Sequence, residues 1–131
     1  MTVKIEPIAA KSVFDPPAYS QAVKVTGVQS IIFISGQVDY DAKGAVGHPG
    51  DIAGQARATY GALKAQVEAA GGTMASIVKI NTYLVDVRHR TEVAAVREEF
   101  FGKKTPASTL IGVTALAQPG WLIEVEAIAV I

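Results

Sequence analysis

The sequence has no cysteine and only two histidines, and each scarcity excludes a class of chemistry. Without cysteine the chain can form no disulfide, thiolate nucleophile or zinc–thiolate cluster. His48 and His89 have no other ligand at metal-binding spacing, so we expect no metal site. The absence of cysteine is typical of a protein of the reducing cytoplasm, which is where we expect this one.

The chain also lacks net charge, because 12 acidic residues balance 12 basic ones. No long-range field would then attract DNA, RNA or an anionic membrane, so we expect no nucleic-acid or membrane partner. The first ten residues contain no apolar core of signal-peptide length. No apolar run approaches the ~20 residues that span a bilayer.

What the sequence does have is a high content of apolar residues. Half of its 131 residues are hydrophobic and only 18% are charged. The length predicts a single domain over residues 1–131. Either a tight core or an interface between subunits could absorb the apolar surplus, and we favour an oligomer because a small subunit has little interior.

The first half of the chain predicts two strands and a helix. Residues 22–26 and 31–35 are short β-rich runs separated by Gly27-Val28-Gln29-Ser30, which is typical of a hairpin. Residues 39–50 predict a loop. A helix follows, capped by Asp51 and ended by Gly71-Gly72, with one apolar stripe: Ile52, Ala56, Tyr60, Leu63, Val67 and Ala70.

The second half predicts strands at residues 77–85, 106–115 and 122–131. Between the first two it predicts a helix that ends at Gly102 and has an apolar inner face: Val93, Val96, Phe100 and Phe101. We place the cap of this helix at Thr91 or a neighbour. The order β-β-α-β-α-β-β predicts an α/β (α+β) two-layer sandwich with a mixed sheet and two helices on one face. The other face carries too many apolar groups to remain in water, so copies of the subunit should pack there: Tyr83, Ile111, Val113, Ile128 and Val130.

Short motifs in a fixed order extend over about residues 19 to 130. They include Tyr19-Ser20-Gln21-Ala22-Val23, Ser35-Gly36-Gln37, Ala69-Ala70-Gly71-Gly72, Pro106-Ala107 and Ile123-Glu124-Val125-Glu126-Ala127. In these motifs the chain resembles the RidA (YjgF-like) family. The resemblance implies a chorismate-mutase-like fold and a barrel-like homotrimer with small-molecule clefts between subunits. It also implies cofactor-free hydrolysis of enamines and imines, such as 2-aminoacrylate and 2-iminopropanoate, to a keto acid and ammonia.

The chain departs from that family at the residue that clamps the substrate. The resemblance implies an arginine directly after Pro106-Ala107, and this position is Ser108. A guanidinium fork gives a carboxylate two charged hydrogen bonds, whereas a hydroxyl gives one neutral bond. The difference of about 2–3 kcal/mol corresponds to roughly 30- to 150-fold in binding. Ala94 and Arg97 also differ from the asparagine and the aromatic residue of many relatives.

Glu126 is the strongest catalytic candidate, and relatives use the matching glutamate to position or activate water. A carboxylate in a central strand has a raised pKa unless it is paired, which would suit proton transfer. The alternative is a structural ion pair with Lys79 or with an arginine across an interface. A free carboxylate facing a cavity would favour catalysis, and an ion-paired one would favour a binding or structural role.

The substrate-binding candidates each have a structural alternative. Tyr19 follows Pro16-Pro17 and either covers a cleft or packs in an interface. Ser35-Gly36 either admits a ligand close to the backbone or forms a bulge. Hydroxyls and backbone amides of Ser108, Thr109 and Leu110 could steady a ligand. Arg97 is by default a solvated charge, and the sharper hypothesis is a relocated anion clamp.

Three functions follow in order of preference. The first is an enamine or imine hydrolase whose substrate differs from 2-iminopropanoate because of Ser108. The second is a binding module on the same trimer, which holds a small metabolite or a partner protein without turnover. The third, endoribonuclease activity, is disfavoured because the chain is neutral and we expect no pair of a histidine and an acid.

Overall fold

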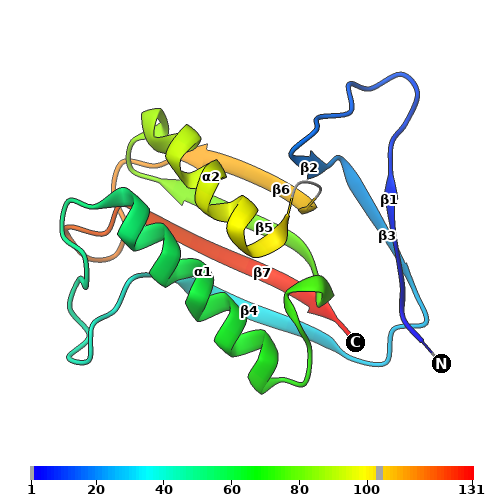
Figure 1. Ribbon diagram of the computed structural model, residues 1–131, viewed down its shortest axis with the longest axis horizontal. Coiled ribbons are helices and arrows are strands. Elements are labelled where there is room, and N and C mark those ends of the chain that lie inside the picture. The colour runs from blue at the N-terminus through cyan, green and yellow to red at the C-terminus, as the bar shows by residue number, and fades with distance from the viewer. Residues whose placement is uncertain (1, 103–104) are drawn as a thin grey trace.

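The computed structural model describes residues 2–102 and 105–131. Its main body is a five-stranded sheet with two helices, α1 and α2, on one face, and a separate two-stranded ribbon stands beside it (Figure 1). This confirms the predicted two-layer α/β architecture. None of the helices in the described part of the chain is long and apolar enough to cross a membrane.

The elements follow the predicted order, with two short strands added before it. The helices are α1 (Ile52–Ala69) and α2 (Arg90–Phe101). The strands are β1 (Lys4–Ile8), β2 (Tyr19–Ser20), β3 (Ala22–Thr26), β4 (Ile31–Gln37), β5 (Ile77–Leu84), β6 (Thr105–Gly112) and β7 (Ile123–Val130).

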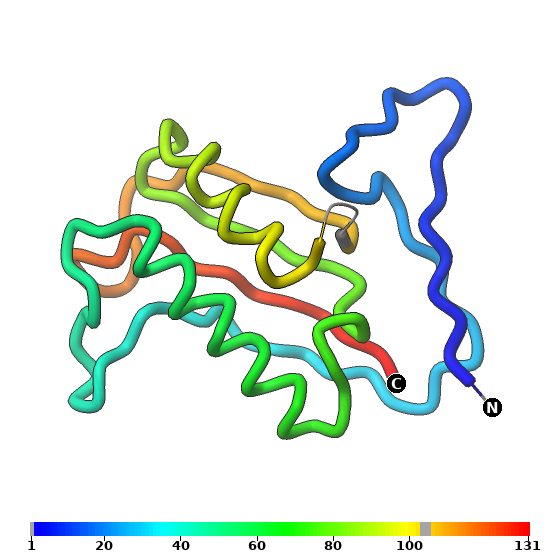
Figure 2. The backbone as a smooth tube through the Cα atoms, in the orientation of Figure 1, coloured from blue at the N-terminus to red at the C-terminus, as the bar shows by residue number. Residues whose placement is uncertain are grey.

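The five-stranded sheet is mixed, with the order β2-β6-β5-β7-β4. Strand β6 runs parallel to both β5 and β2, whereas β7 runs antiparallel to β5 and β4. Parallel neighbours need a crossover connection, and α2 provides it between β5 and β6. The two helices lie side by side across the sheet, with α1 packed against β7 and β4 (Figure 2).

The predicted hairpin between residues 22–26 and 31–35 is wrong. Strand β3 pairs instead with β1, in a register that sets Ile5 opposite Val25. The intervening turn is held by the far end of the chain, since Gln29 and Ser30 N–H both donate to the Ile131 carbonyl, at 2.8 and 2.7 Å. This contact carries β4 directly alongside β7 and leaves β3 to the N-terminal ribbon.

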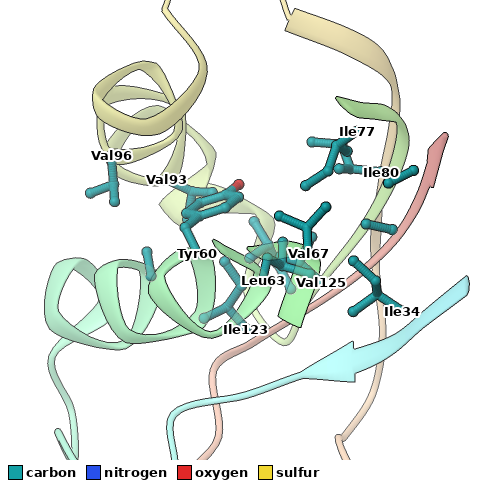
Figure 3. Close-up of a cluster of buried hydrophobic side chains, with 14 of the residues drawn as sticks. Ile34, Tyr60, Leu63, Val67, Ile77, Ile80, Val93, Val96, Ile123 and Val125 are labelled. Atoms are coloured by element: carbon teal, nitrogen blue, oxygen red, sulfur yellow. The ribbon is translucent and has the colours of Figure 1, made fainter. Parts of the chain in front are cut away.

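The core lies between α1, α2 and the covered face of the sheet (Figure 3). Five of the six predicted stripe positions on α1 are buried, and Ala70 is exposed at the helix end. Tyr60 is fully buried and its ring lies 5.7 Å from that of Phe100 and 6.0 Å from that of Phe101. Asp51 caps α1 as predicted, accepting a hydrogen bond from Gly54 N–H at 2.9 Å.

Helix α2 begins before the predicted cap. Its N-cap position is His89, which makes no side-chain capping bond, so the expected cap at Thr91 or a neighbour is wrong. The reason is a short 3₁₀ turn at Val87–His89, which Asp86 caps by accepting from Arg88 N–H at 3.0 Å. This turn leads directly into the helix and makes a second cap unnecessary.

The uncovered face of the sheet is apolar, although not in all the predicted residues. Ile111 is 46% exposed, but Val130 is already buried within one subunit at 4%. Two residues of β4 that the sequence analysis did not single out, Ile31 and Phe33, are 57% and 76% exposed. We name the surface formed by Ile31, Phe33, Tyr83, Ile111 and Ile128 the open face.

Candidate functional site

Glu126 lies in the middle of the open face, held by two donors from the neighbouring strand β5. It stands directly opposite Asn81 in the antiparallel register of β5 and β7. Asn81 Nδ2 donates to Glu126 Oε1 at 2.9 Å, and Tyr83 Oη donates to the same oxygen at 2.8 Å. Cross-strand neighbours on one face of a sheet are close enough for such bonds.

These two bonds reverse the predicted direction of the Glu126 pKa. Hydrogen bonds from Asn81 first, and then from Tyr83, lower the pKa of Glu126, while partial burial opposes them. Donors that favour the charged form outweigh desolvation here, and the rise expected of a carboxylate without a partner does not occur. The same bond raises the pKa of Tyr83. Glu126 is therefore an ionised acceptor at neutral pH.

The structural alternative for Glu126 was an ion pair with Lys79 or with an arginine across an interface, and the second of these stays a prediction. Lys79 Nζ instead donates to Thr109 Oγ1 at 2.9 Å, and Glu126 has no ion pair in the described part of the chain. The carboxylate faces a cavity of about 330 Å³, which we name the carboxylate cavity. Its walls are Phe33, Ile34, Ser35, Lys79, Asn81, Glu126, Ala127 and Ile128.

Ser35 and Gly36 lie at an irregularity in the pairing of β4 with β7, between Ile34 and Gln37. Ser35 is exposed and lines the carboxylate cavity. Gly36 packs against Glu124, where any β-carbon would collide with the glutamate side chain. The glycine thus makes room for Glu124. The irregular pairing at this point agrees with the bulge that the sequence analysis gave as an alternative.

A second cavity, of about 470 Å³, lies on the helix-covered side of the sheet, between α2, β2 and β6. We name it the arginine cavity. It brings together Tyr19, Ser108, Leu110 and Arg97 from the sequence prediction. The complete lining is Ala18, Tyr19, Arg90, Thr91, Ala94, Arg97, Ser108 and Leu110.

The predicted site residues are thus divided between two faces of the sheet. In the register of β6 with β5, Ser108 stands beside buried Ile80, and Thr109 stands beside Asn81. Alternation along a strand then puts Ser108 and Leu110 on the helix side, and Thr109 on the open face with Glu126. Within one subunit these residues form two half-sites.

Arg97 is buried, which the default prediction of a solvated charge did not expect. Its exposed fraction is only 9%, since it follows Val93 by one helical turn and turns toward the same side. The charge of Arg97 also affects Tyr60. Burial raises the pKa of Tyr60 to about 12, and the nearby positive charge opposes this rise. Within the described residues its guanidinium makes no hydrogen bond or ion pair.

The sequence analysis missed the residues that complete the carboxylate cavity. Asn81 and Tyr83 hold Glu126, and Phe33 forms an apolar wall. Alternation along β5 puts Lys79, Asn81 and Tyr83 on one face of the sheet. What could have found the pair is a search for amide and phenol donors opposite Glu126 in an adjacent strand.

Comparison with known proteins decides the family. The sequence profile of the family described as Endoribonuclease L-PSP matches residues 13–131. A RutC family protein of Pyrococcus horikoshii is 37% identical over 111 residues, which cover 85% of each chain. The chain belongs to the RidA family.

Two further relatives relate this RidA-family chain to a named activity and to a solved fold. A 2-iminobutanoate/2-iminopropanoate deaminase of Dermatophagoides farinae is 32% identical, covering 86% of this chain and 85% of the relative. The crystal structure of the Rid-family protein YyfB of Yersinia pestis matches with a TM-score of 0.86 and 30% identity. The match covers 97% of this chain and 98% of that one.

Proposed function

We propose that this RidA-family chain hydrolyses a reactive enamine or imine without a cofactor. The observation that carries the proposal is Glu126, an ionised carboxylate that two neutral donors hold at the wall of an open cavity. The relative that is named as an imine deaminase supports the same chemistry.

We further propose that the reaction takes place between subunits of a homotrimer. The carboxylate cavity and the arginine cavity lie on opposite faces of one sheet, so one subunit cannot bring them together. A second copy packed on the open face would present its arginine cavity to Glu126 and would cover exposed groups such as Phe33 and Ile111. Burial of such groups stabilises an interface.

The chemistry needs only water and one proton carrier. As water attacks the imine carbon, Glu126 accepts a proton from it, and the C=N bond becomes a C–N single bond. The proton then passes to nitrogen and gives a carbinolamine. Glu126 next takes the hydroxyl proton and delivers it to nitrogen, the C–N bond breaks, and ammonia leaves as the carbonyl forms. Tyr19 and the amides and hydroxyls of Ser108 to Leu110 would orient the substrate.

The substrate should differ from 2-iminopropanoate. Ser108 cannot form the forked salt bridge that the RidA resemblance leads us to expect at this position. Deamination of 2-iminopropanoate should then be more than about tenfold slower than in arginine-bearing relatives.

The test is turnover of imines produced in place by an amino-acid oxidase, with keto-acid formation as the measurement. Glu126→Gln should lower the rate by about 100-fold or more, which is the usual contribution of a general base. Glu124→Gln, on the same strand and face, is the matched control. Equal rates for Glu126→Gln and the unaltered chain would overturn the assignment.

A binding module remains the second candidate, because one observation favours it. The two donors that hold Glu126 also make it a weaker base than an ordinary carboxylate, and base catalysis is most effective when the pKa lies near the working pH. In that case keto acids would bind in the cleft, and no imine would be consumed above the uncatalysed rate.

A further inference from the structure

The arginine cavity has a charge imbalance that its walls do not neutralise. Two arginines line it, no acidic residue does, and Tyr19, Thr91 and Ser108 add hydroxyl groups. We propose that this cavity binds a small dicarboxylate, with Arg97 as its principal clamp and Arg90 as the second. The inference rests on the proposed function, since it names the substrate class as the imine of a 2-oxo dicarboxylic acid.

The first support is the state of Arg97. Arg97 as a residue is 9% exposed, and it lines the arginine cavity with no hydrogen bond or ion pair in the described residues. No acidic group of those residues therefore competes with a ligand for its charge. An incoming carboxylate could form two charge-assisted hydrogen bonds with the guanidinium in a partly dry cleft.

The second support is the spacing along α2. Arg90 and Arg97 are seven residues apart and so lie on the same side of the helix, about 10 Å apart along its axis. Ala94 lies between them and also lines the cavity, with only a methyl group to fill the space. Flexible arginine side chains at that separation can reach both ends of a four- or five-carbon diacid.

The third support is the place of the cavity relative to strand β6. Ser108 lines the same cavity as Arg97, so a carboxylate near the Ser108 hydroxyl is also within the space that Arg97 faces. The cation is thereby supplied from the helix and not from the strand. A monoanion would pair with one arginine only and leave the other charge unneutralised.

Binding of three matched probes tests the proposal by calorimetry on the unaltered assembled protein. Succinate carries two carboxylates, butanoate one and succinamide none. Succinate should bind more than about tenfold tighter than butanoate, because one further charged pair forms, and succinamide should not bind measurably. Equal affinity for succinate and butanoate would overturn the assignment of a second clamp.

Variants separate the two arginines. Arg97→Met should weaken succinate binding by roughly 30-fold or more, and Arg90→Gln should reduce succinate to about the affinity of butanoate. Arg57→Gln is the control, since Arg57 is an exposed residue of α1 that pairs with Glu99 at 3.1 Å. A succinate affinity that is unchanged in Arg97→Met would refute the proposal.

A thermal scan distinguishes a ligand clamp from an arginine that pairs with another subunit. If Arg97 has no partner in the ligand-free protein, Arg97→Met should leave its Tm unchanged or raise it, because no ion pair is lost and a partly desolvated charge is removed. If a second copy supplies a carboxylate to Arg97, the same variant should lower the Tm and loosen the assembly. The latter result would also overturn the proposal.

Failure of this inference can be told from failure of the proposed function. Glu126→Gln should bind succinate at least as tightly as the unaltered chain does, because both arginines are kept and one negative charge is removed from the shared cleft. Succinate binding without turnover of any imine would support the anion site and overturn the proposed hydrolase activity. In the opposite case, the alanine-derived imine is turned over as fast as the aspartate-derived one, and Arg97→Met changes neither rate. This result would support the hydrolase activity and overturn the proposal of a dicarboxylate substrate.

Discussion

The two cavities of this chain treat their charged groups in opposite ways. Glu126 is held by Asn81 and Tyr83, so its negative charge is satisfied before any ligand arrives. Arg97 is more deeply buried and has no hydrogen bond or ion pair in the described residues. A satisfied charge is positioned to act on a neighbour, whereas an unsatisfied one is suited to bind an opposite charge. The contrast assigns chemistry to the open face and recognition to the helix side.

The largest effect is expected from a variant that prevents assembly, so that the two cavities cannot meet between subunits. Ile111→Asp places a charge on the open face without altering either cavity lining. It should convert the proposed trimer to monomers and lower the proposed turnover by more than about 100-fold, because a buried unpaired carboxylate opposes assembly. Light scattering and the imine assay measure the two effects.

Val13→Asp is the matched control for this change. Val13 is 50% exposed, close to the 46% of Ile111, but it lies in the connection between β1 and β2. Its replacement should leave both assembly and rate unchanged. A monomeric Ile111→Asp variant with full activity would show that each subunit works alone, and the interface cleft would be abandoned.

A smaller effect is expected from moving the clamp between elements. In an Arg97→Met background, Ser108→Arg puts a guanidinium on β6 in the same cavity and removes the one on α2. It should raise kcat/KM for 2-iminopropanoate by more than about tenfold over Arg97→Met alone, mainly through KM, since the clamp touches a carboxylate that does not react. No gain in a folded, assembled variant would show that the cleft has diverged beyond the clamp.

The smallest expected effect concerns the two donors to Glu126. In the variant that combines Asn81→Ala with Tyr83→Phe, the pKa of Glu126 should rise toward its ordinary value, since both bonds that lower it are lost. The acid limb of the kcat/KM profile should therefore move to higher pH. Tyr40→Phe, in the loop after β4, is the control for loss of a phenol.

Stability should show the same change with the sign fixed by linkage. The folded-state pKa of Glu126 lies below its ordinary value of 4.5, so its stabilising contribution is present above that pH. The contribution is lost as the pH falls through the folded-state value. Thermal scans across this range should show a weaker pH dependence of Tm in the variant with both donors removed. An identical dependence would contradict the role given to Asn81 and Tyr83.

The sequence predicted those features that depend on the period of a single element. The stripe on α1 gave the buried side chains of the main helix, and alternation along β7 gave the face on which Glu126 lies. It could not give the pKa of Glu126, because Asn81 and Tyr83 are 45 and 43 residues away along the chain. A local pattern contains no information on which strand becomes the neighbour.

The errors have the same origin. The hairpin failed because the turn that contains Gln29 and Ser30 bonds to Ile131, at the opposite end of the sequence. Arg97 was expected in solvent because it lies at the edge of the apolar stripe of α2, where a small rotation decides between core and water. The rotation of α2 is fixed by contacts of Phe100 and Phe101 with Tyr60, which belongs to α1.

The contact between Gly36 and Glu124 has a consequence for the history of the family. A β-carbon at position 36 would take the place of the Glu124 carboxylate. A larger residue there therefore requires the glutamate side chain to rotate away or position 124 to carry a shorter residue. Substitutions at the two positions should be correlated among homologues, although they lie on different strands. Such correlated substitution would be a record of packing, and it should not be mistaken for a shared role in catalysis.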